Sequence, residues 1–184
     1  MTDAHPSSAS WPVRIATRED IARIRPLMDR SIRELLRPYL PPEAVEASFE
    51  IMGLDTQLID DGTYFAIDDA GRIIGCGGWS RRATLFGGDH TSGRSPTLLN
   101  PETDAARVRA MYTSPDYVRR GVGRAILVAC ERAATAAGFK RTELMATMAG
   151  EPLYRACGYS VIEPASSTTS MGVRVPLLRM GKTL

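Results

Sequence analysis

A strand, a glycine-containing turn, a long helix and a second strand follow one another between residues 106 and 147, and this order constrains the fold more than any other feature. The apolar run at 106–113 favours a strand, and apolar residues at helical spacing favour a helix that begins at Gly121 and ends before Gly138. A buried strand is expected at 142–147. Because two parallel strands need a crossover connection, the segment predicts a central parallel βαβ unit in an α/β chain.

The turn inside this unit reads SPDYVRRGVGRAIL, and its chemistry suits an anionic ligand. The first N–H groups of a helix lack partners, the helix dipole adds partial positive charge, and Gly121 and Gly123 let a bound group approach the backbone. The pattern is neither a Walker motif nor a dinucleotide-binding motif, because it lacks G-x-x-x-x-G-K-[ST] and a third glycine. Taken alone it leaves two interpretations open, a phosphate cradle or a helix packed closely against its neighbour.

The rest of the chain predicts one domain at 13–184, preceded by a Ser-, Pro- and Ala-rich tail at 1–12 that we expect to be disordered. Pro26 is expected to kink or split the first helix, and Pro176 places the last strand at a sheet edge or a bulge. The long polar loop at 86–103 is expected to be functional or mobile. The other expected elements are strands at 13–16, 63–67, 72–80, 159–163 and 172–180, and helices at 18–36, 41–52 and 151–157.

Composition argues against several classes of protein. The chain has 184 residues and a formal net charge of +2, so no general attraction to nucleic acid or to a membrane is expected. No apolar run approaches the length of a membrane span and the first residues lack a signal-peptide pattern, so we expect a cytoplasmic protein. Cys76, Cys130 and Cys157 are far apart and the two histidines are isolated, which predicts neither a disulfide framework nor a metal site.

Two motifs in sequence carry a resemblance to a known family. The segment MYTSPDYVRRGVGRAIL, followed downstream by GEPLYRACGY, resembles the acetyl-CoA motif and the tyrosine-containing ending of the GNAT acetyltransferase superfamily. The resemblance covers about residues 13–163. It implies a mixed, mostly antiparallel sheet of about seven strands, built around the parallel βαβ unit and flanked by helices. The two motifs are specific for the superfamily but for no particular substrate.

The resemblance also implies roles for individual residues, with acetyl-CoA as co-substrate and no metal. The Met111 amide would face the thioester carbonyl, and the strand around it would bind the acetyl and pantetheine groups. Amides at 119–125, helped by neighbouring arginines, would hold the pyrophosphate, and Tyr154 would protonate the departing thiolate. The implied cofactor-binding residues are Met111, Tyr112, Thr113, Arg119, Arg120, Gly121, Val122, Gly123, Arg124, Ala125 and Thr147.

The sequence departs from the family pattern at three positions. Val118 stands where Gln or Arg is common, which leaves the phosphate amides intact. Thr147 stands where many members have Asn, and a hydroxyl offers fewer hydrogen-bonding groups than an amide. Arg107 stands where protein-acetylating relatives often place a Glu base, so that base is not visible here.

The group that deprotonates the amine therefore stays open. Asp104, Glu143, Glu151 and a water chain are all candidates, and each carboxylate is also an ordinary surface or helix-start residue. Arg107 and Arg109 share one face of their strand. We interpret them as a solvated pair in preference to ligands of an acidic substrate.

The reaction expected from these features is acetyl transfer from acetyl-CoA to a primary amine of a small molecule, by direct attack on the thioester. The alternatives are a protein or peptide N-acetyltransferase and a non-catalytic acyl-CoA sensor. Tyr154 argues against the sensor. A nucleic-acid-binding role for RRGVGR is opposed by the small net charge. The loop at 86–103 and the helices at 18–52 are expected to shape the acceptor pocket, and a homodimer is left open.

Overall fold

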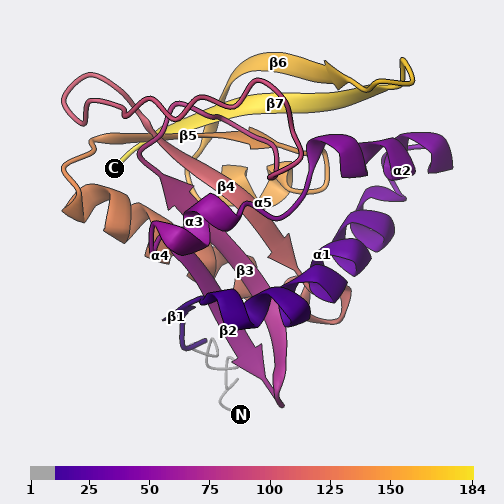
Figure 1. Ribbon diagram of the computed structural model, residues 1–184, viewed down its shortest axis with the longest axis horizontal. Helices are drawn as coiled ribbons and strands as arrows, with labels where there is room; N and C mark the ends of the chain where they lie inside the picture. The colour runs from indigo at the N-terminus through magenta and orange to yellow at the C-terminus, as the bar shows by residue number, and fades with distance from the viewer. Residues whose placement is uncertain (1–10) are drawn as a thin grey trace, which may run out of the picture.

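Seven strands form one sheet in the order β1-β2-β3-β4-β5-β7-β6, and helices cover both of its faces (Figure 1). The structure is a computed structural model that describes residues 11–184. The strands are Arg14–Ile15 (β1), Tyr64–Asp69 (β2), Arg72–Ser80 (β3), Ala106–Thr113 (β4), Arg141–Ala146 (β5), Ser160–Thr168 (β6) and Arg174–Thr183 (β7). The α-helices are Ile21–Leu36 (α1), Pro42–Ile51 (α2), Thr56–Asp60 (α3), Val122–Ala136 (α4) and Glu151–Ala156 (α5).

The central βαβ unit is present as expected. Strands β4 and β5 are parallel and joined by α4, whereas every other pairing in the sheet is antiparallel. The parallel register holds only at Ala106 with Thr142 and at Arg107 with Glu143. Beyond these pairs the two strands separate, which opens the sheet toward their carboxyl ends. The expected fold class is confirmed, and the opening places the functional site.

A β-bulge interrupts β4 at the edge of this opening. Cys76 pairs with Tyr112 and Gly78 pairs with Arg109, so Ala110 and Met111 both stand opposite Gly77. Ala110 has a φ of +51°, in the left-handed region that alanine rarely adopts. The regular in-and-out alternation expected for this strand therefore ends at Arg109.

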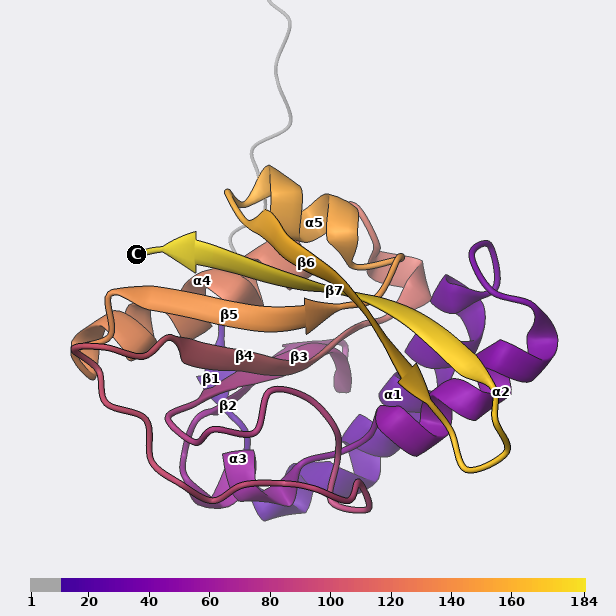
Figure 2. The same ribbon diagram turned by 90° about the horizontal axis from the view of Figure 1, so that it is seen from above.

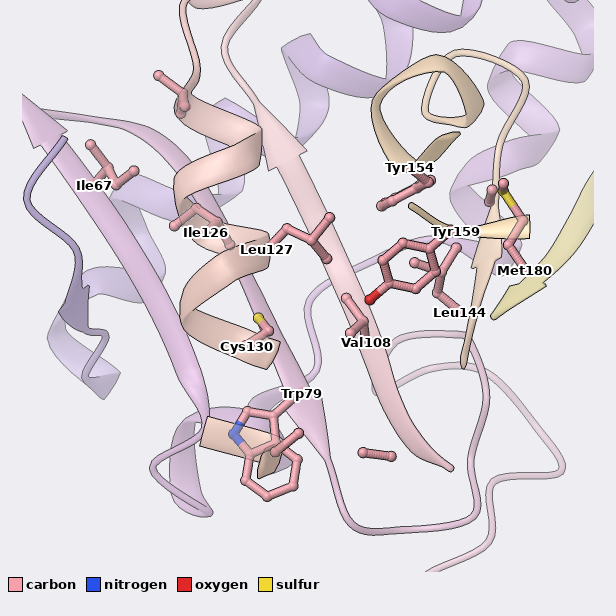
Figure 3. Packing of buried hydrophobic residues seen from close by; sticks show 14 of the residues in the cluster. Ile67, Trp79, Val108, Ile126, Leu127, Cys130, Leu144, Tyr154, Tyr159 and Met180 are labelled. Carbon is pink, nitrogen blue, oxygen red and sulfur yellow. The ribbon is translucent and has the colours of Figure 1, made fainter. Parts of the chain in front are cut away.

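Two large apolar clusters hold the layers together on opposite faces of the sheet. Figure 2 shows α4 and α5 on one side and α1 and α3 on the other. On the first side Ile126, Leu127 and Cys130 of α4 pack with Trp79 and Val108 of the sheet (Figure 3). Cys130 is fully buried there, and desolvation raises the pKa of its thiol. This burial makes Cys130 a packing residue rather than a nucleophile.

Both prolines fit the structure in ways the sequence only partly indicated. Helix α1 runs through Pro26 without splitting, because Pro26 lies on the exposed side where the freed carbonyl of Ala22 can face water. Strand β7 lies between β5 and β6, but pairing with β5 begins at Leu178. Pro176 is therefore paired only with β6, on a stretch of β7 that has no partner strand on its β5 side.

Several features lie outside the sequence expectations. The short helix α3 was not expected, and it begins where the Asp55 carboxylate accepts a hydrogen bond from the Gln57 amide. Strands β6 and β7 are longer than expected and reach α2, where the Ser170 amide donates to the Glu50 carboxylate at 2.7 Å. The expected disordered tail lies outside the described residues from 1 to 10, whereas Trp11 is described and is in contact with the body of the domain.

Candidate active site

A cavity of about 600 Å³ opens where β4 and β5 separate, and it brings most of the implied site residues together. One end is lined by β4, the start of α4 and α5, and we call it the cofactor end. The other end, which we call the acceptor end, is lined by α1, the end of α2, the loop at 85–87, Met145 and Leu177. The two ends are continuous, so one space can hold two reactants in contact.

The bulge in β4 fixes the direction of the Met111 amide. The buried Tyr64 hydroxyl donates a 2.9 Å hydrogen bond to the Ala110 carbonyl oxygen. In a trans peptide the C=O and N–H groups point in opposite directions. The N–H of Met111 is therefore directed away from Tyr64 and from the α1 layer. This arrangement suits the implied contact of that amide with the thioester carbonyl.

Tyr64 can reach Ala110 only because β3 has a glycine between them. A Cβ built on Gly78 would lie 2.7 Å from the Tyr64 ring, too close for any side chain. The ring of Tyr64 is fully buried, and desolvation raises the pKa of its hydroxyl well above the usual value. The hydroxyl therefore stays a donor. Sequence reasoning missed Tyr64, because its role depends on a bulge that the sequence of β4 does not signal.

The start of α4 forms a set of free backbone amides. Arg119 and Gly121 adopt φ values of +63° and +85°, so the chain turns sharply into the helix, and Gly121 has no side chain to cap it. Within the described residues, no hydrogen-bond partner is found for the amides of Val122, Gly123 and Arg124, and all three residues line the cavity. Such amides suit a pyrophosphate.

Ala125 does not belong to this set, contrary to expectation. Its amide donates a 2.9 Å hydrogen bond to the Gly121 carbonyl oxygen, as the first regular bond of the helix. Ala125 also does not line the cavity. The amides available to a phosphate group therefore end at Arg124.

The three arginines expected near the phosphates are placed differently. Arg119 and Arg124 line the cavity. Arg120 turns away, because its guanidinium lies over the Tyr117 ring at 4.5 Å from the centroid. The indole N–H of Trp11 donates to the Arg120 carbonyl oxygen at 2.8 Å, which holds the turn in place. The structure thus leaves Arg119 and Arg124 as candidate phosphate ligands and gives Arg120 a packing contact.

Tyr154 stands on α5 at the cofactor end of the cavity. Its side chain is buried, and its ring meets Tyr159 edge-on at 5.9 Å between centroids. Desolvation raises the pKa of its hydroxyl above 10, so the phenol keeps its proton at neutral pH. No hydrogen-bond partner of this hydroxyl is found among residues 11–184. A protonated, unengaged phenol in the cavity is suited to act as a general acid.

Thr147 also lines the cavity, as expected, but its hydroxyl oxygen is already engaged. It accepts a 3.2 Å hydrogen bond from the Gly150 amide and so shapes the turn before α5. Its hydroxyl hydrogen remains available to a ligand.

None of the three candidate carboxylates faces the cavity. The Glu143 carboxylate binds Arg107 at 2.6 Å and Arg179 at 2.8 Å. The Glu151 carboxylate pairs with Arg155, and that of Asp104 accepts from the Asn100 amide. The described residues that line the cavity include no Asp, Glu or His at all. The base is therefore left to water, or the amine enters already neutral.

The interpretation of Arg107 and Arg109 as a solvated pair is wrong. Arg109 is only 5% exposed, with one guanidinium nitrogen 2.6 Å from Asp55 and another donating to the Gly87 carbonyl oxygen at 2.7 Å. Burial lowers the pKa of Arg109, and the charge of Asp55 opposes that shift. Asp55 is fully buried and also binds Arg94. The loop after β3 covers this face of the strand, so it is not solvated.

No helix in the described part of the chain is long and apolar enough to span a membrane. Across residues 11–184, no group of three or more His, Cys, Asp or Glu side chains is arranged to hold a metal ion.

Comparison with known proteins agrees with the fold. Residues 30–159 match the model of the Acetyltransferase (GNAT) family, which covers well over half of the chain. The chain belongs to the GNAT acetyltransferase family, whose fold binds acetyl-CoA or CoA, and it is an acyltransferase of that type. No curated protein matches the sequence.

Solved structures share the fold at low sequence identity. A GCN5-related N-acetyltransferase (Aminotransferase, Class-II) from Rhodopseudomonas palustris is 20% identical with a TM-score of 0.71, covering 98% of this chain and 100% of that one. PaiA N-acetyltransferase from Thermoplasma acidophilum, in complex with coenzyme A, is 13% identical with a TM-score of 0.63 (95% and 99% covered). A ribosomal-protein-alanine N-acetyltransferase from Brucella melitensis is 16% identical with a TM-score of 0.62 (94% and 99%). At these identities the likeness supports the fold alone.

Proposed function

We propose that this chain transfers the acetyl group of acetyl-CoA to the primary amine of a small molecule, by direct attack of the amine on the thioester. The observation that carries the proposal is the single cavity that joins the free amides of α4, the bulge at Met111 and the Tyr154 phenol to an acceptor end. In the reaction a C–N bond forms and the C–S bond breaks. The nitrogen loses a proton to water, the thiolate gains one from Tyr154, and the Tyr154 phenolate regains its proton from water.

Three groups of the chain contribute to the rate in different ways. Holding both reactants in one cavity makes the bimolecular reaction effectively unimolecular. The Met111 N–H stabilises the negative charge that develops on the thioester oxygen, because its direction is fixed before the reaction. The Tyr154 phenol supplies the proton that makes the thiol a good leaving group. Within the described lining no side chain acts as the base, so the amine must arrive neutral or lose its proton to water.

Two fixed contacts at the acceptor end favour a small acceptor over a peptide. The Tyr112 hydroxyl accepts a 3.0 Å hydrogen bond from the Gly53 amide, which ties the end of α2 to β4. The guanidinium of Arg109 holds the Gly87 carbonyl oxygen, which ties down the loop after β3. Both segments border the acceptor end, and these two contacts limit how far they can move away from it. A peptide would need an open groove at this position.

The proposal is tested by an acceptor screen that identifies the product as well as the released thiol. Acetyl-CoA is offered with small amines, with polyamines and with peptides that carry free amino termini, and CoA release is compared with the mass of the acetylated acceptor. We expect equal amounts of CoA and N-acetylated small amine, and no acetylated peptide. Turnover of peptides alone would replace the proposal with peptide acetylation. Binding of acetyl-CoA with no turnover of any acceptor would indicate a sensor.

A further inference from the structure

The acceptor end of the cavity is mostly apolar, and its described polar side chains are those of Ser31 and Tyr39, which carry hydroxyls and no charge. Met52, Leu85, Phe86 and Met145 line it from α2, the loop after β3 and β5, and all four side chains are half-buried. Met52, Phe86 and Met145 pack against a separate buried apolar cluster of Ile51, Val175 and Leu177, of which Ile51 and Leu177 also line the cavity. Apolar surface from several elements therefore converges on the place where the body of the acceptor must sit. Covering that surface favours an apolar ligand.

This end of the cavity offers no partner for a charge on the acceptor. No carboxylate among the described lining residues could pair with a second ammonium group. Arg109 also lines the cavity, but its guanidinium is shared between Asp55 and Gly87. Its Nε atom has no partner within the described residues, yet it is covered by protein and is closed to the cavity. A charged group placed here would lose water without gaining a partner of opposite charge from the described lining.

The lack of a carboxylate or histidine base in the described lining also favours an apolar acceptor. An amine that must be neutral before it attacks is best supplied by a compound that is weakly basic, or whose ammonium form is disfavoured in an apolar site. An apolar, carboxylate-free pocket disfavours the ammonium form in this manner. The lining and the missing base therefore select the same kind of acceptor.

We infer that the acceptor is a primary amine borne on an apolar aryl or alkyl body, with no carboxylate and no second ammonium group. This inference rests on the proposed function. The apolar body occupies the space between Met52, Phe86 and Met145, and the amino group faces the thioester near Met111. Amino acids, polyamines and aminoglycosides are poor acceptors, because each brings a charge to the apolar end.

The first test compares acceptors that differ by one charged group. The kcat/KM of phenethylamine is measured against that of phenylalanine, and that of hexylamine against that of 1,6-diaminohexane, by thiol release with the product mass as a check. We expect each charged member to be poorer by about 100-fold or more, since an unpaired charge would be buried. Equal or better use of the charged members would overturn the inference and leave the proposed function standing. Turnover of no small amine would overturn both.

A second test adds one negative charge to the acceptor end and measures the change in acceptor preference. Met52→Glu supplies a carboxylate at the acceptor end, and Met52→Gln supplies a polar side chain of the same size without the charge. We expect Met52→Glu to narrow the preference for hexylamine over 1,6-diaminohexane at least 10-fold, while Met52→Gln does not. Ile162→Glu, at an exposed site on β6, is the control and should leave the preference unchanged. An unchanged preference in folded Met52→Glu would contradict the inference, and the acceptor pairs test it on the wild type if that variant fails to fold.

Discussion

Tyr154→Phe is expected to lower kcat by about 100- to 10,000-fold, the range for loss of a positioned general acid. The ring stays in its contact with Tyr159, so the cavity keeps its shape and only the proton donor is lost. The KM for acetyl-CoA should change little, because the free amides of α4 are untouched. Steady-state thiol release measures both constants.

The control for this variant is Tyr159→Phe. The Tyr159 hydroxyl lies 2.8 Å from the Thr142 hydroxyl in the core and does not line the cavity. Its loss should cost about 1 kcal/mol of stability and leave kcat unchanged. The pH profile gives a separate check, because the raised pKa of Tyr154 keeps the acid protonated as pH rises. An alkaline fall in the wild-type kcat below pH 10, or an unchanged kcat in Tyr154→Phe, would remove Tyr154 from the mechanism.

Tyr64→Phe is expected to lower kcat by about 10- to 100-fold, less than the loss of an oxyanion donor itself. Without the hydroxyl, the Ala110 carbonyl loses this hydrogen bond, and the peptide that carries the Met111 N–H can turn. The carbonyl stretch of bound acetyl-CoA, measured by infrared difference spectroscopy with a ¹³C label, should move back toward its frequency in water. The free energy of unfolding should also fall by about 1–3 kcal/mol, because a buried hydrogen-bond acceptor loses its partner.

Two companion variants separate positioning from a general loss of stability. Ser48→Ala also removes a buried hydroxyl that donates to a backbone carbonyl, in α2 and outside the cavity lining. It should lower stability without moving the carbonyl frequency. Ala110→Gly in the Tyr64→Phe background should restore part of kcat, since glycine adopts the positive φ of the bulge without strain. If the carbonyl frequency of acetyl-CoA bound to Tyr64→Phe equals that in the wild type, Tyr64 does not position the amide.

Local patterns predicted the central unit of this fold well. The strand, the turn with Gly121 and Gly123, the helix and the return strand all depend on residues close in sequence, and the structure places them as expected. Tyr154 was proposed from a short motif that the family resemblance points to, and the structure places it on α5; its catalytic role stays a prediction. These features needed no knowledge of tertiary contacts.

The features that sequence reasoning missed depend on contacts between distant segments. Arg109 was misjudged because its partner Asp55 lies in the connection between α2 and α3, which strand alternation cannot reveal. The bulge was missed because Ala110 is not a residue that normally signals a positive φ. Tyr64 was also missed, because its contact with Ala110 exists only once β2, β3 and the bulge lie side by side.

The most direct test of the central claim is a ¹H–¹⁵N NMR titration of the labelled chain with acetyl-CoA. The claim is that the cofactor lies in the opening between β4 and β5, on the amides at Met111 and at the start of α4. We predict that the largest saturable shifts belong to the amides of Met111, Val122, Gly123 and Arg124, while that of Ala125, bonded within the helix, moves less. Saturation by acetyl-CoA with these amides unmoved, or with the largest shifts elsewhere in the sheet, would contradict the claim.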